Sequence, residues 1–196
     1  MKIYKHENYK EYKKAQIKKN KRKLKHVWVK PAEILMLSKK IKTYVPDASF
    51  GICHGVRNGW EVQELRRLLK IEVIGTDISP TVKEFKNTIQ WDFHNMNDEW
   101  RNKVDFIYSN SFDHSYDPER CLNVWMKCIR KNIGVCFIHW LDINKDTIDS
   151  ADCFAGTYKE YGELISQNFN IIDVFGSPGR KIFAINHKKS EKINEI

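Results

Sequence analysis

The stretch Gly51-Ile-Cys-His-Gly55-Val-Arg-Asn-Gly59 is a turn with three glycines that follows a short apolar run. Two further segments end in the same way, Ile74-Gly-Thr-Asp77 and Trp91-Asp92-Phe93-His94, and each carries a carboxylate. Glycine lets the backbone adopt a positive φ and approach a ligand closely. In open α/β sheets, ligands bind beyond the carboxyl ends of the strands. Three consecutive strand ends of this kind predict a nucleoside-sized pocket at one edge of a parallel sheet.

The rest of the chain alternates between apolar runs and amphipathic stretches. We expect helices at about 8–25, 31–42, 60–69, 118–131 and 158–167, with a short one from Ser79-Pro80. We expect strands at 49–53, 71–75, 88–91, 104–108, 133–140, 169–175 and 181–186. Strands separated by helices predict an α/β fold with a mainly parallel, doubly wound sheet. The last two strands are joined by a short turn, so they should pair antiparallel.

The basic character of the chain is confined to its beginning. The protein has 196 residues, which suits one domain, and a formal net charge of +9. Residues 1–43 contain 15 Lys/Arg against 3 Glu, whereas the remainder has 19 basic and 22 acidic residues. We therefore expect a basic helical extension at 1–43, a main domain at 44–187 and a polar tail at 188–196.

Several classes of protein are disfavoured by composition. No apolar run approaches the roughly 20 residues of a membrane span, and the lysine-rich start lacks the apolar core of a secretory signal. The five cysteines have no C-x-x-C spacing, which argues against a disulfide framework and against a zinc site. No metal site is expected from the spacing of His, Cys and Asp, and no Walker or Gly-x-Ser-x-Gly motif is present. The expected compartment is a reducing cytoplasm.

A later segment carries a resemblance to a known family. Val104–Glu119 contains Asp113-His114 followed by Asp117-Pro118. This resembles the fourth motif of class I S-adenosylmethionine-dependent methyltransferases, in which many small-molecule enzymes have Glu-His and then Asp-Pro. The order of motifs from about Ser49 to Asn186 also matches. The resemblance implies a Rossmann-like methyltransferase sheet and methyl transfer from S-adenosylmethionine to a small molecule, with S-adenosylhomocysteine as product.

The resemblance also implies a cofactor site. In that family the glycine loop contacts the methionine moiety, the acid after the second strand holds the ribose, and the acid after the third contacts adenine. Arg57 would meet the methionine carboxylate or an anionic substrate. The usual first motif has a strand carboxylate and a denser Gly-x-Gly-x-Gly, which this chain lacks. The implied cofactor residues are Cys53, His54, Gly55, Arg57, Gly59, Asp77, Ile78, Asp92, Phe93, Asn110 and Ser111.

His114 is the candidate general base, because it lies in the loop where substrate would approach and imidazole exchanges protons near neutral pH. The alternative is that it only packs or forms hydrogen bonds within the loop. Asp113 could orient His114 or contact the amino group of the cofactor. His139, Trp140 and Asp142 follow the fifth strand and could line the acceptor pocket, although a buried structural role is favoured for His139.

Three alternatives stay open for function, and the oligomeric state is not indicated. A nicotinamide reductase would need Tyr-x-x-x-Lys late in the domain, and neither Tyr158 nor Tyr161 is followed by that lysine. A nucleic-acid methyltransferase would use the basic extension on phosphates. A non-catalytic cofactor-binding module would explain the unusual first motif. The extension could also be a solvated helix face or a lid, lined by Tyr9, Tyr12 or Trp28, and we favour a combination of these two.

Overall fold

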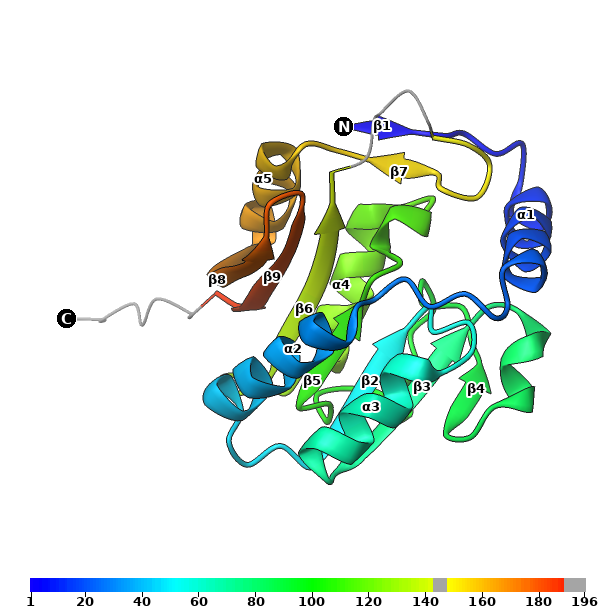
Figure 1. Ribbon diagram of the computed structural model, residues 1–196. Helices are drawn as coiled ribbons and strands as arrows, with labels where there is room; N and C mark the ends of the chain where they lie inside the picture. The colour runs from blue at the N-terminus through cyan, green and yellow to red at the C-terminus, as the bar shows by residue number, and fades with distance from the viewer. Residues whose placement is uncertain (143–147, 189–196) are drawn as a thin grey trace.

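A seven-stranded sheet forms the centre of the protein, seen in a computed structural model that describes residues 1–142 and 148–188 (Figure 1). The strand order is β4-β3-β2-β5-β6-β9-β8. Within this sheet, β9 runs in the opposite direction to the other strands, so its pairs with β6 and β8 are antiparallel and the remaining pairs are parallel. The predicted α/β fold and the antiparallel pairing at the end of the chain are confirmed. The strands are β2 (Phe50–His54), β3 (Glu72–Asp77), β4 (Thr88–Gln90), β5 (Phe106–Ser109), β6 (Val135–Leu141), β8 (Phe169–Ser177) and β9 (Arg180–His187).

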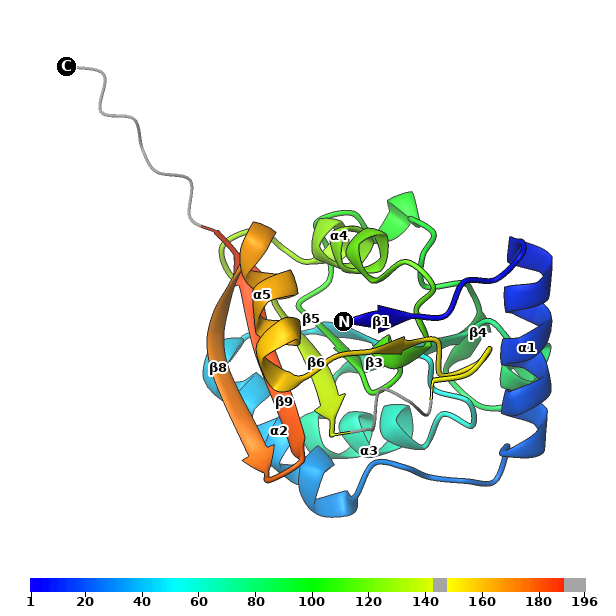
Figure 2. The same ribbon diagram turned by 90° about the horizontal axis from the view of Figure 1, so that it is seen from above.

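Helices cover both faces of the sheet, as the view from above shows (Figure 2). Successive strand residues point to opposite faces, so Phe106 and Tyr108 of β5 pack on one side and Ile107 on the other. The first face is covered by α2 (Pro31–Tyr44) and α3 (Trp60–Leu69), and the second by α4 (Pro118–Cys128) and α5 (Tyr158–Asn168). In the described ranges, no helix is both long and apolar enough to cross a membrane.

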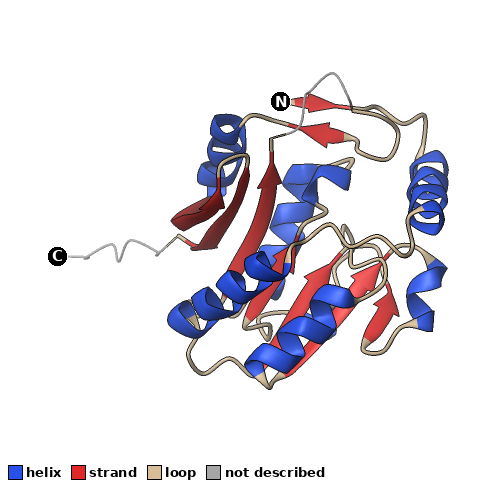
Figure 3. Ribbon diagram, in the orientation of Figure 1, coloured by secondary structure: helices blue, strands red, loops and turns tan. Residues whose placement is uncertain are grey.

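Short helical turns lie in the segments after β3, β4 and β5; Figure 3 distinguishes helices, strands and loops by colour. They are η1 (Pro80–Glu84), η2 (Asp98–Trp100) and η3 (Phe112–His114). Helix α4 begins where the sequence indicates, because the Asp117 side chain accepts a hydrogen bond from the Arg120 N–H and Pro118 occupies the first turn. Gly51 lies within β2 and not in the turn. A Cβ atom there would be 2.2 Å from the Phe106 ring, so this glycine serves strand packing.

The two helices of the basic extension differ in their surroundings. Helix α2 is part of the core, with Leu37 and Ile41 fully buried against the sheet. Helix α1 (Tyr9–Arg22) lies at the side of the molecule near η1 and β4 (Figure 1). The chain before it forms β1 (Lys2–Ile3), which pairs with β7 (Phe154–Ala155) in a second, two-stranded sheet that the sequence did not predict. Of the expected tail, residues 189–196 lie outside the described residues.

Asp105 ties the amino ends of β2 and β5 together. Its buried carboxylate accepts hydrogen bonds from the backbone N–H groups of Ser49 (2.7 Å) and Phe50 (3.0 Å), and it pairs with Arg130 (2.7 Å). Burial raises the pKa of Asp105, but these bonds outweigh it and hold the pKa below its ordinary value. The carboxylate thus fixes where the two central strands begin.

Asp105→Ala should lower the free energy of unfolding by about 2–4 kcal/mol, because it leaves several buried donors without an acceptor. Asp98→Ala is the control, since its pair with Arg101 is exposed. The depressed pKa makes the carboxylate's contribution fully present above the ordinary carboxyl pKa and lost as pH falls through the lower, folded-state value. Urea unfolding at pH 7 and pH 3 measures this. An equal loss for both variants at pH 7 would contradict it.

Candidate functional site

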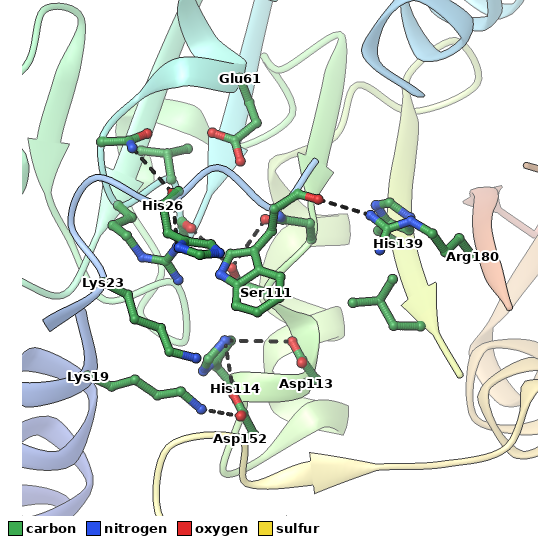
Figure 4. A pocket seen from close by; sticks show the side chains of 17 residues that line it. Lys19, Lys23, His26, Glu61, Ser111, Asp113, His114, His139, Asp152 and Arg180 are labelled. Carbon is green, nitrogen blue, oxygen red and sulfur yellow. Dashed lines mark hydrogen bonds and ion pairs between the residues drawn. The ribbon is translucent and has the colours of Figure 1, made fainter. Parts of the chain in front are cut away.

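Two adjoining pockets lie at the carboxyl ends of the parallel strands. The first, of about 150 Å³, reaches from the glycine turn to His139 and Arg180, and Figure 4 shows its lining side chains. The second, of about 40 Å³, lies between α1 and the ends of β3 and β4. The two share five lining residues, so together they form one site. The shared residues are Lys19, Gly55, Arg57, Ser111 and His114.

The glycine turn forms the floor of both pockets. Gly55 has φ +72°, and a Cβ atom there would lie 2.4 Å from the Ser111 Cβ. Its N–H donates to the Thr76 carbonyl at 2.8 Å, which pins the turn to β3. Arg57 follows in the same left-handed region, with φ 49°. Only glycine fits at position 55, and the turn there leaves bare backbone facing the site.

Three of the predicted residues of this turn line neither pocket, and two of them are side chains buried in the core. His54 stacks on Trp125, with ring centroids 4.9 Å apart, and its Nδ1 is 2.7 Å from the Thr76 hydroxyl. Burial lowers the pKa of His54 to about 3, so it stays neutral. Cys53 is buried on the opposite face of β2, and Gly59 is the residue that precedes α3. Alternation along β2 places the two buried side chains in the two core layers.

Glu61, on the first turn of α3, is a pocket residue that the sequence analysis missed. Figure 4 shows its side chain directed toward the first pocket. It is 6% exposed, and its Oε2 has no hydrogen-bond partner. Burial raises the pKa of Glu61 to about 7, against the opposing effect of Arg57. An acid in the first helical turn is ordinarily explained by the helix dipole, so the sequence carried no distinct signal for this residue.

Asp77 is brought to the second pocket but is already engaged. Its Oδ1 accepts the Ser79 N–H at 2.8 Å and its Oδ2 accepts the Arg57 N–H at 2.9 Å. Burial raises its pKa. Each carboxylate oxygen has a further lone pair, so Asp77 can hold the turn and still accept a hydrogen bond from a ligand. Ile78 and Phe93 line the same pocket.

Asp92 also lines the second pocket, and α1 reaches it. Its Oδ2 accepts the Tyr9 hydroxyl at 2.8 Å, and its Oδ1 lies 2.8 Å from the Nδ1 of His94. The other ring nitrogen of His94 lies 2.8 Å from the Ser115 hydroxyl. Burial raises the pKa of Asp92, but the bonds from His94 and Tyr9 outweigh it and the pKa stays lowered. Asp92 is therefore an ionised acceptor at neutral pH.

His114 is held in one orientation by hydrogen bonding. Its Nδ1 is 2.8 Å from the Ala151 carbonyl, which can only accept, so Nδ1 carries the hydrogen. Its Nε2 faces Asp152 at 3.4 Å and Asp113 at 3.9 Å (Figure 4). Asp113, His114 and Asp152 each have one potential metal-ligating atom here, and these three atoms lie within 4.8 Å of one another. The spacing of the residues in the sequence did not reveal this grouping. The ammonium of Lys19 contacts Asp152.

The far end of the first pocket is formed by the end of β6 and the start of β9. His139 lines it and is also buried, and burial lowers its pKa to about 4. Arg180 forms two hydrogen bonds to Glu33 of α2, at 2.5 and 3.0 Å. The backbone carbonyl of Trp28 accepts a hydrogen bond from Arg180 at 3.1 Å, whereas its half-exposed indole lies beside His26. Trp140, expected here, instead donates its indole N–H to the Gly156 carbonyl in the core. At this end of the pocket, the charge of Arg180 is thus neutralised by Glu33.

The fold is similar to solved structures of methyltransferases. It matches Burkholderia thailandensis 1,6-didemethyltoxoflavin-N1-methyltransferase, solved with 1,6-didemethyltoxoflavin and S-adenosylhomocysteine, over 95% of this chain and 93% of that one (TM-score 0.74, 12% identity). It matches OxaC, solved with S-adenosylhomocysteine and oxaline, over 93% of this chain and 54% of the other (TM-score 0.68, 14% identity). A methyltransferase from Aquifex aeolicus matches over 81% and 99% (TM-score 0.57, 16% identity).

At such low sequence identities, structural similarity shows only that the folds are alike. A putative zinc-dependent alcohol dehydrogenase from Rhodobacter sphaeroides also matches, with TM-score 0.69 and 8% identity. No protein-family model matches the sequence, and no curated protein matches it. The chain has the Rossmann-like fold of class I S-adenosylmethionine-dependent methyltransferases.

Glu61→Gln should stabilise the unliganded protein at high pH. A carboxyl group whose pKa is raised in the folded state does not destabilise the protein below its unfolded-state pKa near 4.5, because it is then protonated in both states. The destabilisation grows as the pH rises to about 7. Removing the charge should therefore raise the free energy of unfolding at pH 8 by up to about 3 kcal/mol, with little change at pH 4. Glu64→Gln is the matched control on the same helix. Thermal unfolding at both pH values would contradict this if Glu61→Gln were the less stable protein at pH 8.

Proposed function

We propose that the protein is an S-adenosylmethionine-dependent methyltransferase that acts on a small molecule. The observation that carries the proposal is the convergence of the Gly55 turn, Asp77, Asp92 and His114 on two adjoining pockets. These residues come from three strand ends and the loop after β5, which is the arrangement expected for a nucleoside-containing ligand at the edge of a parallel sheet.

The residues present fit the cofactor. Asp77 would hold the ribose and Asp92 the adenine amino group, with Phe93 beside the ring. The close approach of Ser111 to Gly55 leaves a narrow cradle of backbone and hydroxyl groups for the methionine end. Asn110 and Ser111 line the first pocket, where that end would lie. When bound, the cofactor supplies an electrophilic methyl group on a positively charged sulfur.

The first pocket supports a small acceptor. Its lining includes the aromatic and apolar side chains of Trp28, His139 and Leu141. The similar proteins solved with 1,6-didemethyltoxoflavin and with oxaline hold small molecules, which supports the same class here. Lys19 and Lys23 of the basic extension face this pocket, and no observation separately favours nucleic acid as the acceptor.

His114 is the proposed general base. Its Nε2 lone pair faces the pocket region between Asp113 and Asp152, while Nδ1–H stays on the Ala151 carbonyl. A proton leaving the attacking atom of the acceptor would move to Nε2, and the two carboxylates would stabilise the imidazolium. The Lys19 contact would hold Asp152 in position. Positioning of the acceptor in line with the methyl group supplies the rest of the acceleration.

Binding of S-adenosylhomocysteine tests the cofactor assignment. Calorimetry should detect it, and Asp92→Asn should weaken it about 10-fold or more, because an ionised acceptor is replaced by an amide. Asp98→Asn, exposed on η2, should bind as the parent does. Failure of the parent protein to bind either S-adenosylmethionine or S-adenosylhomocysteine at millimolar concentration would refute the proposed function.

Turnover tests the role of His114. A panel of small heteroaromatic and phenolic acceptors, assayed by release of S-adenosylhomocysteine, should contain one that is methylated. With that acceptor, His114→Gln should lower kcat by about 10²–10⁴-fold, while the Kd of S-adenosylhomocysteine changes less than about threefold. Asp152→Asn should lower kcat less and shift its pH profile. An unchanged kcat in His114→Gln would show that the imidazole has only a structural role.

A further inference from the structure

Arg57 and the buried Glu61 are side chains of opposite charge that line the same pocket without forming an ion pair with each other. The Arg57 Nε and the Glu61 Oε2 are both buried, and neither has a hydrogen-bond partner. Within residues 1–142 and 148–188, the side chain of Arg57 forms one hydrogen bond, from Nη1 to the His26 carbonyl at 3.3 Å. In the described part of the chain, neither residue forms an ion pair within 4.0 Å. Both line the first pocket beside the glycine turn.

Such groups are costly unless a partner is supplied. Burying a charged or polar atom without a hydrogen bond disfavours the folded state, and native structures rarely leave one unpaired. Other nearby acids do not satisfy Arg57. Asp77 already accepts two backbone N–H groups, and Asp113 and Asp152 face His114. A ligand that enters the first pocket, which both residues line, could supply the missing partner of each atom.

The backbone fixes both groups in place. The Arg57 N–H is held by Asp77 and its φ is 49°, a conformation that few residues other than glycine adopt readily. Gly59, with φ 70°, turns the chain into α3, so that Glu61 falls on its first turn. The pair is thus built by the local geometry of the turn and not by a flexible surface segment.

Glu61 also supplies a charge that the strand lacks. The first motif has Cys53 in place of a strand carboxylate. Burial raises the pKa of the Cys53 thiol, and the negative charge of Glu61 raises it further, which places the carboxylate near this position. The carboxylate therefore comes from Glu61 on α3 and not from a residue of β2. The basic residue of the pair, Arg57, lies two positions after Gly55.

We propose that Arg57 and Glu61 form a clamp for an α-amino-acid zwitterion, the guanidinium taking the carboxylate and the Glu61 carboxylate taking the ammonium. The clamp rests on the proposed function, since the zwitterion assigned to it is the methionine end of the cofactor. A guanidinium matches a carboxylate in geometry and charge, and an ammonium group suits an unpaired carboxylate oxygen. The clamp makes the protein select the intact cofactor over nucleosides that lack the amino-acid group.

Three ligands and three variants test the clamp by calorimetry. S-adenosylhomocysteine has both charged groups, decarboxylated S-adenosylhomocysteine keeps only the ammonium, and 5′-methylthioadenosine has neither. Glu61→Gln should weaken the first two by about 10- to 100-fold and the third by less than about threefold. Arg57→Gln should weaken only S-adenosylhomocysteine. Glu64→Gln, three residues along the same helix, should change none of the three.

The outcomes separate the clamp from the proposed function. If the parent protein binds none of these nucleosides, the proposed function fails. If it binds S-adenosylhomocysteine and Glu61→Gln does not weaken it, or weakens 5′-methylthioadenosine as much, the clamp fails and the function stands. Should Arg57→Gln not fold, the three-ligand comparison on Glu61→Gln alone decides, because this variant removes a buried charge without changing side-chain size.

Discussion

The carboxylate of Asp77 is the constraint on which the site depends. It ends β3, accepts the Arg57 N–H from the glycine turn, and accepts the Ser79 N–H that begins η1. Three chain segments therefore take their positions from one buried acid. The turn can hold Arg57 at a positive φ because this hydrogen bond and the Gly55 bond to Thr76 fix the backbone that leads into it, and the Gly59 N–H donates to the Val56 carbonyl across it. A ligand that also used Asp77 would bind to a group that is already pre-positioned.

Helix α1 closes the site from one side. Part of the basic charge of this helix therefore lies at the site. Tyr9 contacts Asp92, the Tyr12 hydroxyl donates to the His114 carbonyl at 3.2 Å, and Lys19 contacts Asp152. Each of these contacts reaches a group that the proposed chemistry would use. The helix is therefore more than a solvated basic face. The Tyr9 hydroxyl already donates to the Oδ2 of Asp92, so an adenine amino group bound in the proposed way would share this carboxylate with Tyr9.

The sequence predicted the fold well because local signals agreed with one another. Alternating strands and helices, Pro118 after Asp117, and acids directly after strands all indicate elements that tertiary packing did not override. His54 could also have been placed in the core, since alternation along β2 sets it opposite Cys53. Glu61, Lys19 and Asp152 could not be found in this way. They join the site through packing of α1, α3 and the loop before β7, which no spacing in the sequence encodes.

Locally unfavourable features, such as a bulky residue at a positive φ and buried polar atoms without partners, gather at the site. Among described residues with positive φ other than glycine, three are Asn and one is the Lys70 helix end, which leaves Arg57 as the bulky residue inside a loop. The same few residues carry two buried atoms without a hydrogen-bond partner, the Nε of Arg57 and the Oε2 of Glu61, on side chains of opposite charge. A fold optimised only for stability would replace them with apolar side chains. Their retention beside a bare glycine backbone is explained most simply by a ligand whose own two charges are spaced to meet them.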